Sequence, residues 1–267
     1  MSFIQDNEDL IRLSVFFGTF VAMALWEVLS PRTKRVLPRM RRWCVNWALV
    51  IIDSLTLRLL VPVLAVGVAG CVADAGWGIL NWVVLPTSLK VILAVVVLDM
   101  LIYWQHVASH RFAVLWRFHR VHHADRDIDV TTGARFHPVE ILLSMVYKFA
   151  CIALLGAPAM AVFLFEVLLN ASAMFNHSNV TIGRKTDQMI RKLIVTPDMH
   201  RVHHSIEEKE TNSNYGFFLS VWDRLFRTYI DQPKGGHEGM TIGLREFQSD
   251  EPSSLRWSLL SPFMKSR

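Results

Sequence analysis

The apolar residues of this chain gather into long runs separated by short polar stretches. Residues 10–29 form the first run, and its length of about 20 residues is what a helix needs to cross a bilayer. Residues 43–69 and 89–105 form two further runs, which we expect to be membrane-spanning helices. Between them, residues 70–88 are rich in glycine and carry Trp77 and Trp82, so they predict a loop with a short stretch at the membrane interface.

Two shorter apolar stretches follow, at residues 141–155 and 159–175, and Gly156-Ala157-Pro158 separates them. Each is short for a full crossing, so we expect a helical hairpin that enters the membrane and returns to the same face. The predicted fold is an all-α integral membrane protein with about three to four transmembrane helices plus a re-entrant or spanning helical hairpin. We expect one domain over residues 1–267: membrane spans in 1–105, the hairpin in 141–175, and a helical cap in 106–140 and 176–245.

Composition agrees with a membrane protein, since 52% of the residues are hydrophobic and the mean hydropathy is +0.31. The net charge of +5 is uneven, because residues 31–42 hold six basic residues and no acid. Such a segment beside a span marks the cytoplasmic side and can contact anionic headgroups, although a solvated loop is also compatible. No fold that recognises nucleic acid accompanies the charge. This orientation places the N-terminus outside the cell and the later polar segments on the cytoplasmic face.

Two further features narrow the class of protein. The first nine residues are acidic, with Asp6, Glu8 and Asp9, so we expect no cleavable signal peptide. The three cysteines are isolated and lie in or beside apolar segments, which predicts buried free thiols and neither a disulfide framework nor an iron–sulfur cluster. The second span contains Asn46, Asp53 and Arg58, and such polar groups should face protein rather than lipid.

Histidine is the residue type that carries candidate chemistry. Ten of the eleven histidines fall between positions 106 and 204, and eight of them form three boxes: His106 and His110; His119, His122 and His123; His200, His203 and His204. Histidines three or four positions apart share one helix face, so each box can direct several imidazoles at one point. Neutral imidazole binds iron, copper, zinc and nickel, and one metal takes about four to six ligands. The boxes therefore predict two metals.

The spacing also weighs against several kinds of metal site. The HExxH pattern of zinc proteases and the Glu-x-x-His ligands of soluble di-iron bundles are both absent. Haem iron takes only one or two axial ligands. His122 and His123 point about 100° apart on a helix, which suits two neighbouring metals. An all-nitrogen site keeps a high positive charge, as suits iron that binds and reduces dioxygen.

Three more histidines lie outside the boxes. His137 precedes Pro138 at the start of the hairpin, and His177 ends it, so both are candidate ligands, although a helix cap and a polar helix end explain them too. His237 sits in a glycine-rich surface turn, and we expect no ligand there. Metal-bound imidazoles need acceptors for their other nitrogen, and the candidates are Glu140, Asp198 and Asp223.

These boxes resemble those of the fatty acid hydroxylase superfamily, which includes the sterol desaturases. The likeness covers about residues 20–245 and includes these further matching segments: Trp26-Glu27, Pro31-Arg32, Arg135 to Glu140, Phe175 to Val180, Thr196 to His204, Asn214-Tyr215-Gly216, and Trp222 to Thr228. Two positions depart from the family pattern. Arg227 stands where glycine is common, and Ala173 stands where some relatives have another histidine.

The resemblance implies a non-haem di-iron centre at the membrane surface that uses O2 and two electrons to hydroxylate or desaturate a lipid C–H bond. Its ligands would be the eight box histidines with His137 and His177, and no catalytic residue is implied beyond these ligands. No flavin or nucleotide site is visible, so electrons would come from a ferredoxin- or cytochrome-type partner.

Two other functions stay open at this point: a zinc-dependent membrane lipid hydrolase, and a haem or metal-handling protein. The lipid itself is not readable from the residues, and sterol, fatty acyl, ether lipid, carotenoid and aminolipid all remain.

Overall fold

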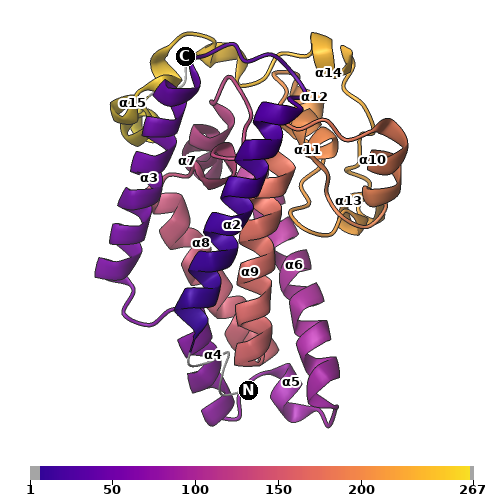
Figure 1. Ribbon diagram of the computed structural model, residues 1–267. Coiled ribbons are helices and arrows are strands. Elements are labelled where there is room, and N and C mark those ends of the chain that lie inside the picture. Colours follow the sequence, from indigo (N-terminus) through magenta and orange to yellow (C-terminus); the bar gives the residue numbers. More distant parts are fainter. Residues whose placement is uncertain (1–6, 265–267) are drawn as a thin grey trace.

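The computed structural model describes residues 7–264, and this part of the chain consists of helices joined by loops, with three isolated β-bridges and no longer strand (Figure 1). Asp6, which contributes to the acidic start, lies outside the described residues. Within them, five helical segments are long and apolar enough to cross a membrane. Four of these segments are the helices α2 (Glu8–Leu29), α6 (Thr87–Arg111), α8 (Pro138–Leu155) and α9 (Ala159–His177). The fifth segment, Arg39–Trp82, begins with α3 (Arg39–Leu60). The expected all-α membrane fold is confirmed.

The second predicted span differs from the expectation. The apolar pattern predicts one helix over residues 43–69, but α3 ends at Leu60 and a separate helix, α4 (Ala65–Asp74), follows. Val61 is extended, with φ −121° and ψ 92°, and it precedes Pro62. Proline has no N–H to donate and its ring disfavours a helical residue before it, so the helix must stop here. A short helix, α5 (Ile79–Trp82), then lies at the end of the molecule opposite α15 (Leu255–Leu260) (Figure 1), and Trp77 and Trp82 at this helix are exposed.

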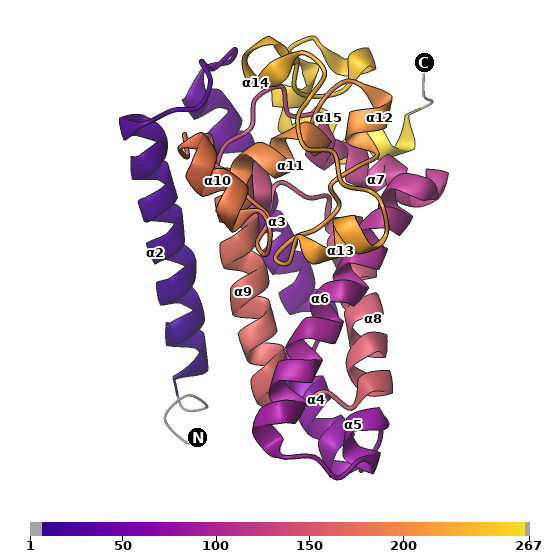
Figure 2. The same ribbon diagram turned by 90° about the vertical axis from the view of Figure 1, so that its right-hand side faces the viewer.

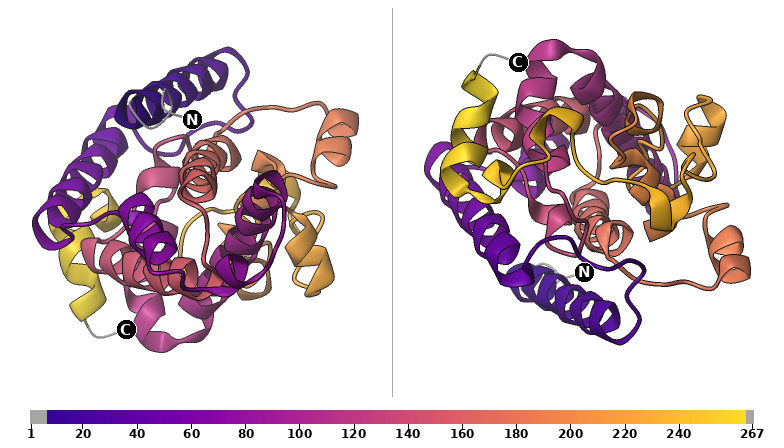
Figure 3. Two further views of the ribbon diagram at one scale, coloured as in Figure 1. Left: turned by 90° about the horizontal axis from the view of Figure 1, so that it is seen from below. Right: turned by 90° about the horizontal axis from the view of Figure 1, so that it is seen from above.

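Helices α8 and α9 form the predicted hairpin, and they extend as far as the start of α5. Gly156 ends α8 in a left-handed conformation, with φ +68°, and its backbone lies against Gly78, which has φ +94°. A Cβ on Gly78 would lie 2.3 Å from the Gly156 nitrogen, so both positions need glycine. The hairpin therefore reaches the end of the molecule at which α6 begins. Helix α9 packs against both α2 and α6, and Figure 3 shows it in the middle of the bundle.

The other end of the bundle carries a cap of short helices (Figure 2). Residues 111–140 belong to the expected helical cap and include α7 (Ala113–His123) and the one-turn 3-10 helix η1 (Thr132–Ala134). The rest of the cap contains these helices: α10 (Arg184–Ile190), α11 (Pro197–His203), α12 (Glu208–Thr211), α13 (Val221–Leu225), α14 (Gly236–Gly239), η2 (Arg245–Phe247), η3 (Glu251–Ser253), α15 (Leu255–Leu260) and η4 (Ser261–Phe263).

The basic segment at residues 31–42 is only partly a loop, since Arg39 already begins α3. Five of its six basic residues form ion pairs within the chain: Arg32 with Asp198, Arg35 and Arg39 with Glu27, Arg41 with Asp250, and Arg42 with Asp125 and Asp129. The prediction of a segment available to headgroups or solvent is therefore wrong for buried Arg42. The acids that neutralise the segment come from distant positions, which a local charge count does not detect.

The cysteines are free, as predicted, but only Cys151 is buried, while Cys44 and Cys71 are exposed. Cys44 lies on α3, and the outer surface of this helix carries exposed apolar side chains such as Leu55 and Leu59. An apolar neighbourhood in the sequence therefore does not imply burial inside the protein, because a spanning helix also presents apolar residues to lipid.

Candidate metal centre

Nine histidines converge at the junction between the membrane helices and the cap. They form two groups, and within each group the candidate ligand atoms all lie within 4.8 Å of one another. The first group contains His106, His110, His119, His123 and His203; the second contains His122, His177, His200 and His204. The two groups adjoin, since the rings of His123 and His204 stack with their centroids 4.5 Å apart. All eight box histidines and His177 are thus brought together.

The boxes at residues 119–123 and 200–204 each divide their three histidines between the two groups, in opposite ways. On α7, His119 and His123 serve the first group while His122 serves the second. In the box that begins on α11, His200 and His204 serve the second group while His203 serves the first. Residues four apart share a helix face and adjacent residues diverge by about 100°, so this division follows from helical geometry. The predicted divergence of His122 from His123 is confirmed, and the structure brings the two boxes together.

Protein acceptors fix the orientation of five of these imidazoles through the Nδ1 atom. His106 Nδ1 lies 2.7 Å from the Tyr215 carbonyl oxygen, and His203 Nδ1 lies 2.6 Å from that of Ser213. The remaining contacts join His119 Nδ1 to Glu140 at 2.6 Å, His177 Nδ1 to the Ala173 carbonyl at 2.7 Å, and His122 Nδ1 to the Arg135 carbonyl at 3.2 Å. A carbonyl or carboxylate oxygen accepts the hydrogen bond, so Nδ1 carries the proton and Nε2 presents a lone pair.

These lone pairs face one another at short range. In the first group, the Nε2 atom of His106 lies 3.1 Å from Nε2 of His119 and 3.0 Å from Nε2 of His203. In the second, the Nε2 atom of His177 lies 3.1 Å from Nε2 of His122 and 3.0 Å from Nε2 of His200. Where both rings carry the proton on Nδ1, as in the contacts of His106 with His119 and His203 and of His177 with His122, lone pairs so close repel unless a cation lies between them. The donor set therefore fits a metal ion in each group.

Other imidazole nitrogens in the centre are buried without any partner. Neither ring nitrogen of His110, His123 or His204 has a hydrogen bond, nor does Nδ1 of His200. Burial first, and the neighbouring imidazoles second, lower the pKa of His123, His200 and His204 well below the ordinary value. Burial likewise lowers the pKa of His203 to about 3. Neutral rings with free lone pairs are the ligand form of histidine, and buried nitrogens left unpaired are costly.

His137 does not join either group, in contrast to the expectation. Its Nδ1 accepts a hydrogen bond from the Val139 backbone N–H at 3.1 Å, and its Nε2 lies 3.2 Å from the Leu259 carbonyl oxygen. It is the N-cap of α8, with Pro138 at the first helical position. Both nitrogens are thereby used in the protein, which is the physical reason that this histidine is not among the candidate ligands.

His237 lies outside both groups, as expected, but it is buried rather than in an exposed turn. Its Nε2 lies 3.6 Å from Asp198, and burial lowers its pKa to about 4. Of the three proposed acceptors, only Glu140 contacts a box histidine. Asp198 pairs with Arg32 instead.

Asp223 acts on the centre through the backbone. Its carboxylate accepts hydrogen bonds from the N–H groups of Tyr215 and Gly216, at 2.8 and 2.9 Å. This fixes the loop whose carbonyls hold His106 and His203. Asn214 in this loop is left-handed with φ 50°, and so is Arg227 after α13 (Val221–Leu225), with φ 62°. Glycine tolerates this conformation best, which explains why an arginine at position 227 is unusual. Sequence reasoning missed the carbonyls of Ser213 and Tyr215, because a backbone acceptor has no residue type of its own.

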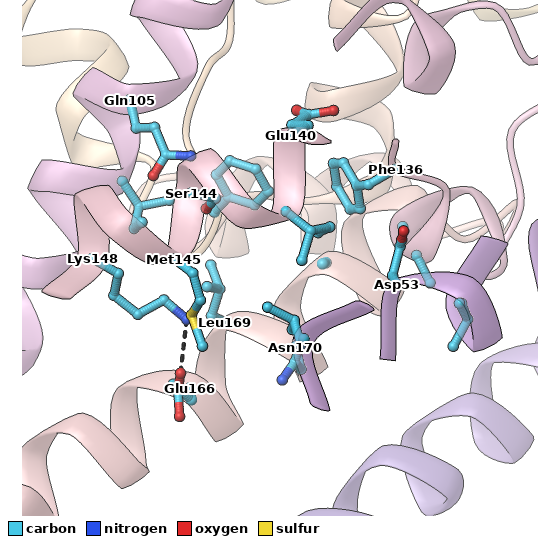
Figure 4. Close-up of a pocket in the computed structure, with 18 of the residues that line it drawn as sticks. Asp53, Gln105, Phe136, Glu140, Ser144, Met145, Lys148, Glu166, Leu169 and Asn170 are labelled. Carbon is cyan, nitrogen blue, oxygen red and sulfur yellow. Dashed lines mark hydrogen bonds and ion pairs between the residues drawn. The ribbon is translucent and has the colours of Figure 1, made fainter. Parts of the chain in front are cut away.

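A cavity of about 370 Å³ lies among the membrane helices, and Figure 4 shows part of its lining. His106 and His119 of the first histidine group line it together with Glu140 and Phe136. Apolar side chains such as Leu57, Met145 and Leu169 line it as well. Residues of α2 and α3 contribute as well, so the cavity lies between the outer helices and the hairpin. A long apolar molecule in this cavity would end beside the histidines.

Comparison with known proteins places these features in a family. The chain is 33% identical over 150 residues to an ornithine lipid hydroxylase of Rhizobium tropici, an alignment that covers 56% of this chain and 44% of that protein. It is 29% identical over 156 residues to an alkylglycerol monooxygenase of Danio rerio, covering 58% and 34% of the two chains. It is 28% identical over 135 residues to the lathosterol oxidase of Mus musculus, covering 48% and 40%.

The aligned region thus spans less than half the length of each of these relatives. No solved structure matches the chain. The family model described as fatty acid hydroxylase matches residues 91–228, just over half of the 267 residues, and this region contains all nine converging histidines. The chain belongs to the fatty acid hydroxylase family.

Proposed function

We propose that the chain is a membrane non-haem di-iron oxidoreductase that uses O2 to hydroxylate or desaturate a lipid C–H bond. One observation carries the proposal: two groups of buried imidazoles adjoin, and His106 and His119 of the first group line a largely apolar cavity within the membrane helices. The relatives named above are a lipid hydroxylase, a monooxygenase and an oxidase, which supports oxidative chemistry. The proposal treats residues 1–267 as one domain.

The donor set supports iron over zinc. A structural zinc site takes four ligands in a tetrahedron. Five imidazoles in one group exceed the four positions of a closed tetrahedral site. Two irons held by these nine histidines would supply the binding and reduction of O2.

The protein itself would hold the ligands, orient the substrate and exclude water. Glu140 and the carbonyls of Ser213 and Tyr215 keep the Nε2 atoms of their histidines turned inward. Such outer contacts fix the tautomer and raise the basicity of the ligand. The ring of Phe136 stacks on His122 and also lines the cavity, so it places an apolar surface beside His122, whereas His106 and His119 line the cavity directly.

The alternatives have weaker support. A haem would need only one or two of nine histidines, and the remaining nitrogens would stay buried and unpaired. In a zinc hydrolase a carboxylate must activate water, but Glu140 already accepts from His119 through Oε1. The oxidative function of the relatives also disfavours hydrolysis.

Electrons would come from an external ferredoxin- or cytochrome-type partner, and we place the histidine end of the bundle in the cytoplasm. This orientation rests on the basic residues at 31–42, which lie at that end. A tag after residue 264 should therefore be digested only when protease enters the cytoplasm. A tag that is accessible from outside intact cells contradicts the orientation.

Lipid mass spectrometry of cells with and without the protein tests the reaction. We expect lipids that gain one oxygen atom or lose two hydrogen atoms, and we expect no such products with the His203→Ala variant. Identical lipid profiles at confirmed expression of metal-loaded protein would refute the proposed function.

A further inference from the structure

A second cavity lies in the cap, outside both histidine groups. Its volume is about 800 Å³, which is within the range of small-molecule sites. Its lining comes from the segment between α2 and α3, from residues 126 and 127 after α7, from Arg201 of α11, and from residues at and after α14. Figure 1 shows α14 at the end of the molecule opposite α4 and α5. The cavity is therefore far from the end at which the hairpin turns.

Arg201 is a buried cation that lines this cavity. It is only 1% exposed, and its guanidinium donates to two neutral oxygens, Thr33 Oγ1 at 3.4 Å and Asn179 Oδ1 at 3.1 Å. Its Nε–H has no partner, and no ion pair joins it to an acid in residues 7–264. Burial lowers its pKa only to about 10, so it stays charged at neutral pH. Arg42 is equally buried, but two aspartates neutralise it.

The acids around Arg201 are already engaged. Asp198, Glu27 and Asp127 act on its charge at longer range. Asp198 pairs with Arg32, and Glu27 pairs with two other arginines of the basic segment. Asp127 accepts hydrogen bonds from two backbone N–H groups, at 2.9 and 2.7 Å. The remaining acid of the lining, Glu238, is exposed to solvent, which screens its charge.

Three further side chains add hydrogen-bond donors to the same cavity. His237 is 5% exposed, neither of its ring nitrogens has a hydrogen bond, and its Nε2 lies 3.6 Å from Asp198. Burial lowers its pKa to about 4, so the neutral ring offers one N–H. Lys34 is exposed and has no ion pair within the described part of the chain, and Arg126 pairs only with the exposed Asp250, at 3.3 Å.

We infer that this cavity binds the phosphate group of a small molecule, with Arg201 and His237 at its buried side and Lys34 and Arg126 nearer the solvent. A carboxylate offers two oxygens, whereas a phosphate offers at least three, which suits the larger number of donors. The planar guanidinium matches phosphate geometry, and the anion neutralises a buried charge that otherwise lacks a partner. The site is separate from the proposed reaction, since it contains none of the converging histidines.

Titration with glycerol 3-phosphate tests the site, with glycerol as the uncharged control. The purified protein is held in phosphatidylcholine nanodiscs, and calorimetry measures the affinity. We expect saturable binding of the phosphate compound alone, and the affinity should fall as the salt concentration rises. Arg201→Gln should weaken binding by about tenfold or more, because a charge-assisted hydrogen bond to a buried group is lost.

Surface variants keep the test decisive if Arg201→Gln does not fold, which thermal melting checks. Lys34→Ser should weaken binding by about threefold, because an exposed charge contributes less than a buried one. Lys209→Ser is the matched control, since Lys209 is an exposed lysine of the cap that does not line the cavity, and it should bind like the wild type. His203→Ala should also keep binding, because the phosphate does not occupy the histidine centre.

Two lipids then distinguish the sources of the phosphate group. Phosphatidic acid in the nanodiscs should compete with glycerol 3-phosphate, and oleate of equal charge should not, if a lipid headgroup supplies the phosphate. Competition by neither lipid supports a soluble ligand. Absence of saturable binding by the wild type overturns the inference. So does an affinity that Lys34→Ser and folded Arg201→Gln leave unchanged, or one that His203→Ala abolishes.

Discussion

Two buried polar regions lie next to each other at the cap end of the bundle, and their hydrogen bonding differs sharply. The first is an arginine–aspartate network, in which Arg42 contacts Asp125 at 2.6 Å and 2.7 Å and also pairs with Asp129. Arg135 extends it by donating to the Val121 and Pro252 carbonyls and to Asn46, at 2.7–2.8 Å. Every guanidinium nitrogen of these two arginines has a partner within the chain.

The histidine centre is equally buried, but it leaves seven ring nitrogens unpaired, on His110, His123, His200 and His204. Its remaining Nε2 atoms face one another. Burial alone therefore does not distinguish a binding site from a structural network. A network that satisfies itself stabilises the fold, whereas a centre with unpaired acceptors needs a cation from outside.

Removal of one ligand should have the largest effect on function. His203→Ala should abolish lipid oxidation. The variant should also lose metal from both groups, and not only from the group that contains His203, because the two groups adjoin. Adding His123→Ala should cause no further loss, since residues that act as a unit are not additive. Metal analysis and product analysis of the purified variants check this. A His203→Ala protein with full metal and activity would show that the two boxes do not form one centre.

The arginine–aspartate network should respond in the opposite way. Arg42→Met should destabilise the fold by about 3–5 kcal/mol, because it leaves buried carboxylates without a counter-charge. This loss of stability should be similar with and without bound metal. Denaturation of metal-loaded and chelator-treated protein measures it. A destabilisation that disappears when metal is removed would mean that Arg42 acts through the metal centre.

Chelation should affect only the histidine centre. Metal removal should lower the melting temperature of the wild type, because the buried imidazole lone pairs lose their cation. The melting temperature with and without a chelator measures the difference. An unchanged melting temperature in protein shown to have lost its metal would contradict the fit of the donor set.

Glu140 connects protein to centre by a single contact, so its effect should be intermediate. Glu140→Gln should weaken metal affinity by about 10–100-fold, as loss of an outer carboxylate does at other histidine sites. Metal titration of the stripped protein gives the value. Ser144→Ala, one turn further along α8 and lining the same cavity, is a matched control that should bind metal normally.

The two histidines outside the centre should have the smallest effects. His137→Ala should keep its metal and lose about 1 kcal/mol of stability, as loss of an N-cap does. His237→Gln should keep metal as well. Because burial depresses the folded pKa of His237 to about 4, its contribution to stability is present above the unfolded value near 6.5 and is lost as pH falls towards 4. The variant should therefore lose less stability than the wild type over that range.

The sequence was informative where periodicity controls geometry. Residues at spacings of three and four predicted the shared faces of the boxes, and the 100° step predicted that His122 and His123 separate. The sequence did not show that His177 joins the centre and His137 does not, because both flank the hairpin. The backbone conformation at each helix end decides whether the imidazole ring points towards the centre. Nor could the sequence pair Arg42 with Asp125, 83 positions away, or identify the carbonyls of Ser213 and Tyr215. Those depend on tertiary contacts that leave no local pattern.

Metal content of the purified wild-type protein tests the central claim most directly. Elemental analysis should find two iron ions per chain, and the absorption spectrum should lack a Soret band, because no haem is bound. Variants in each histidine group, His203→Ala and His200→Ala, should both lose iron. One ion per chain, zinc at full occupancy in an active protein, or a Soret band with haem stoichiometry would contradict a non-haem di-iron centre.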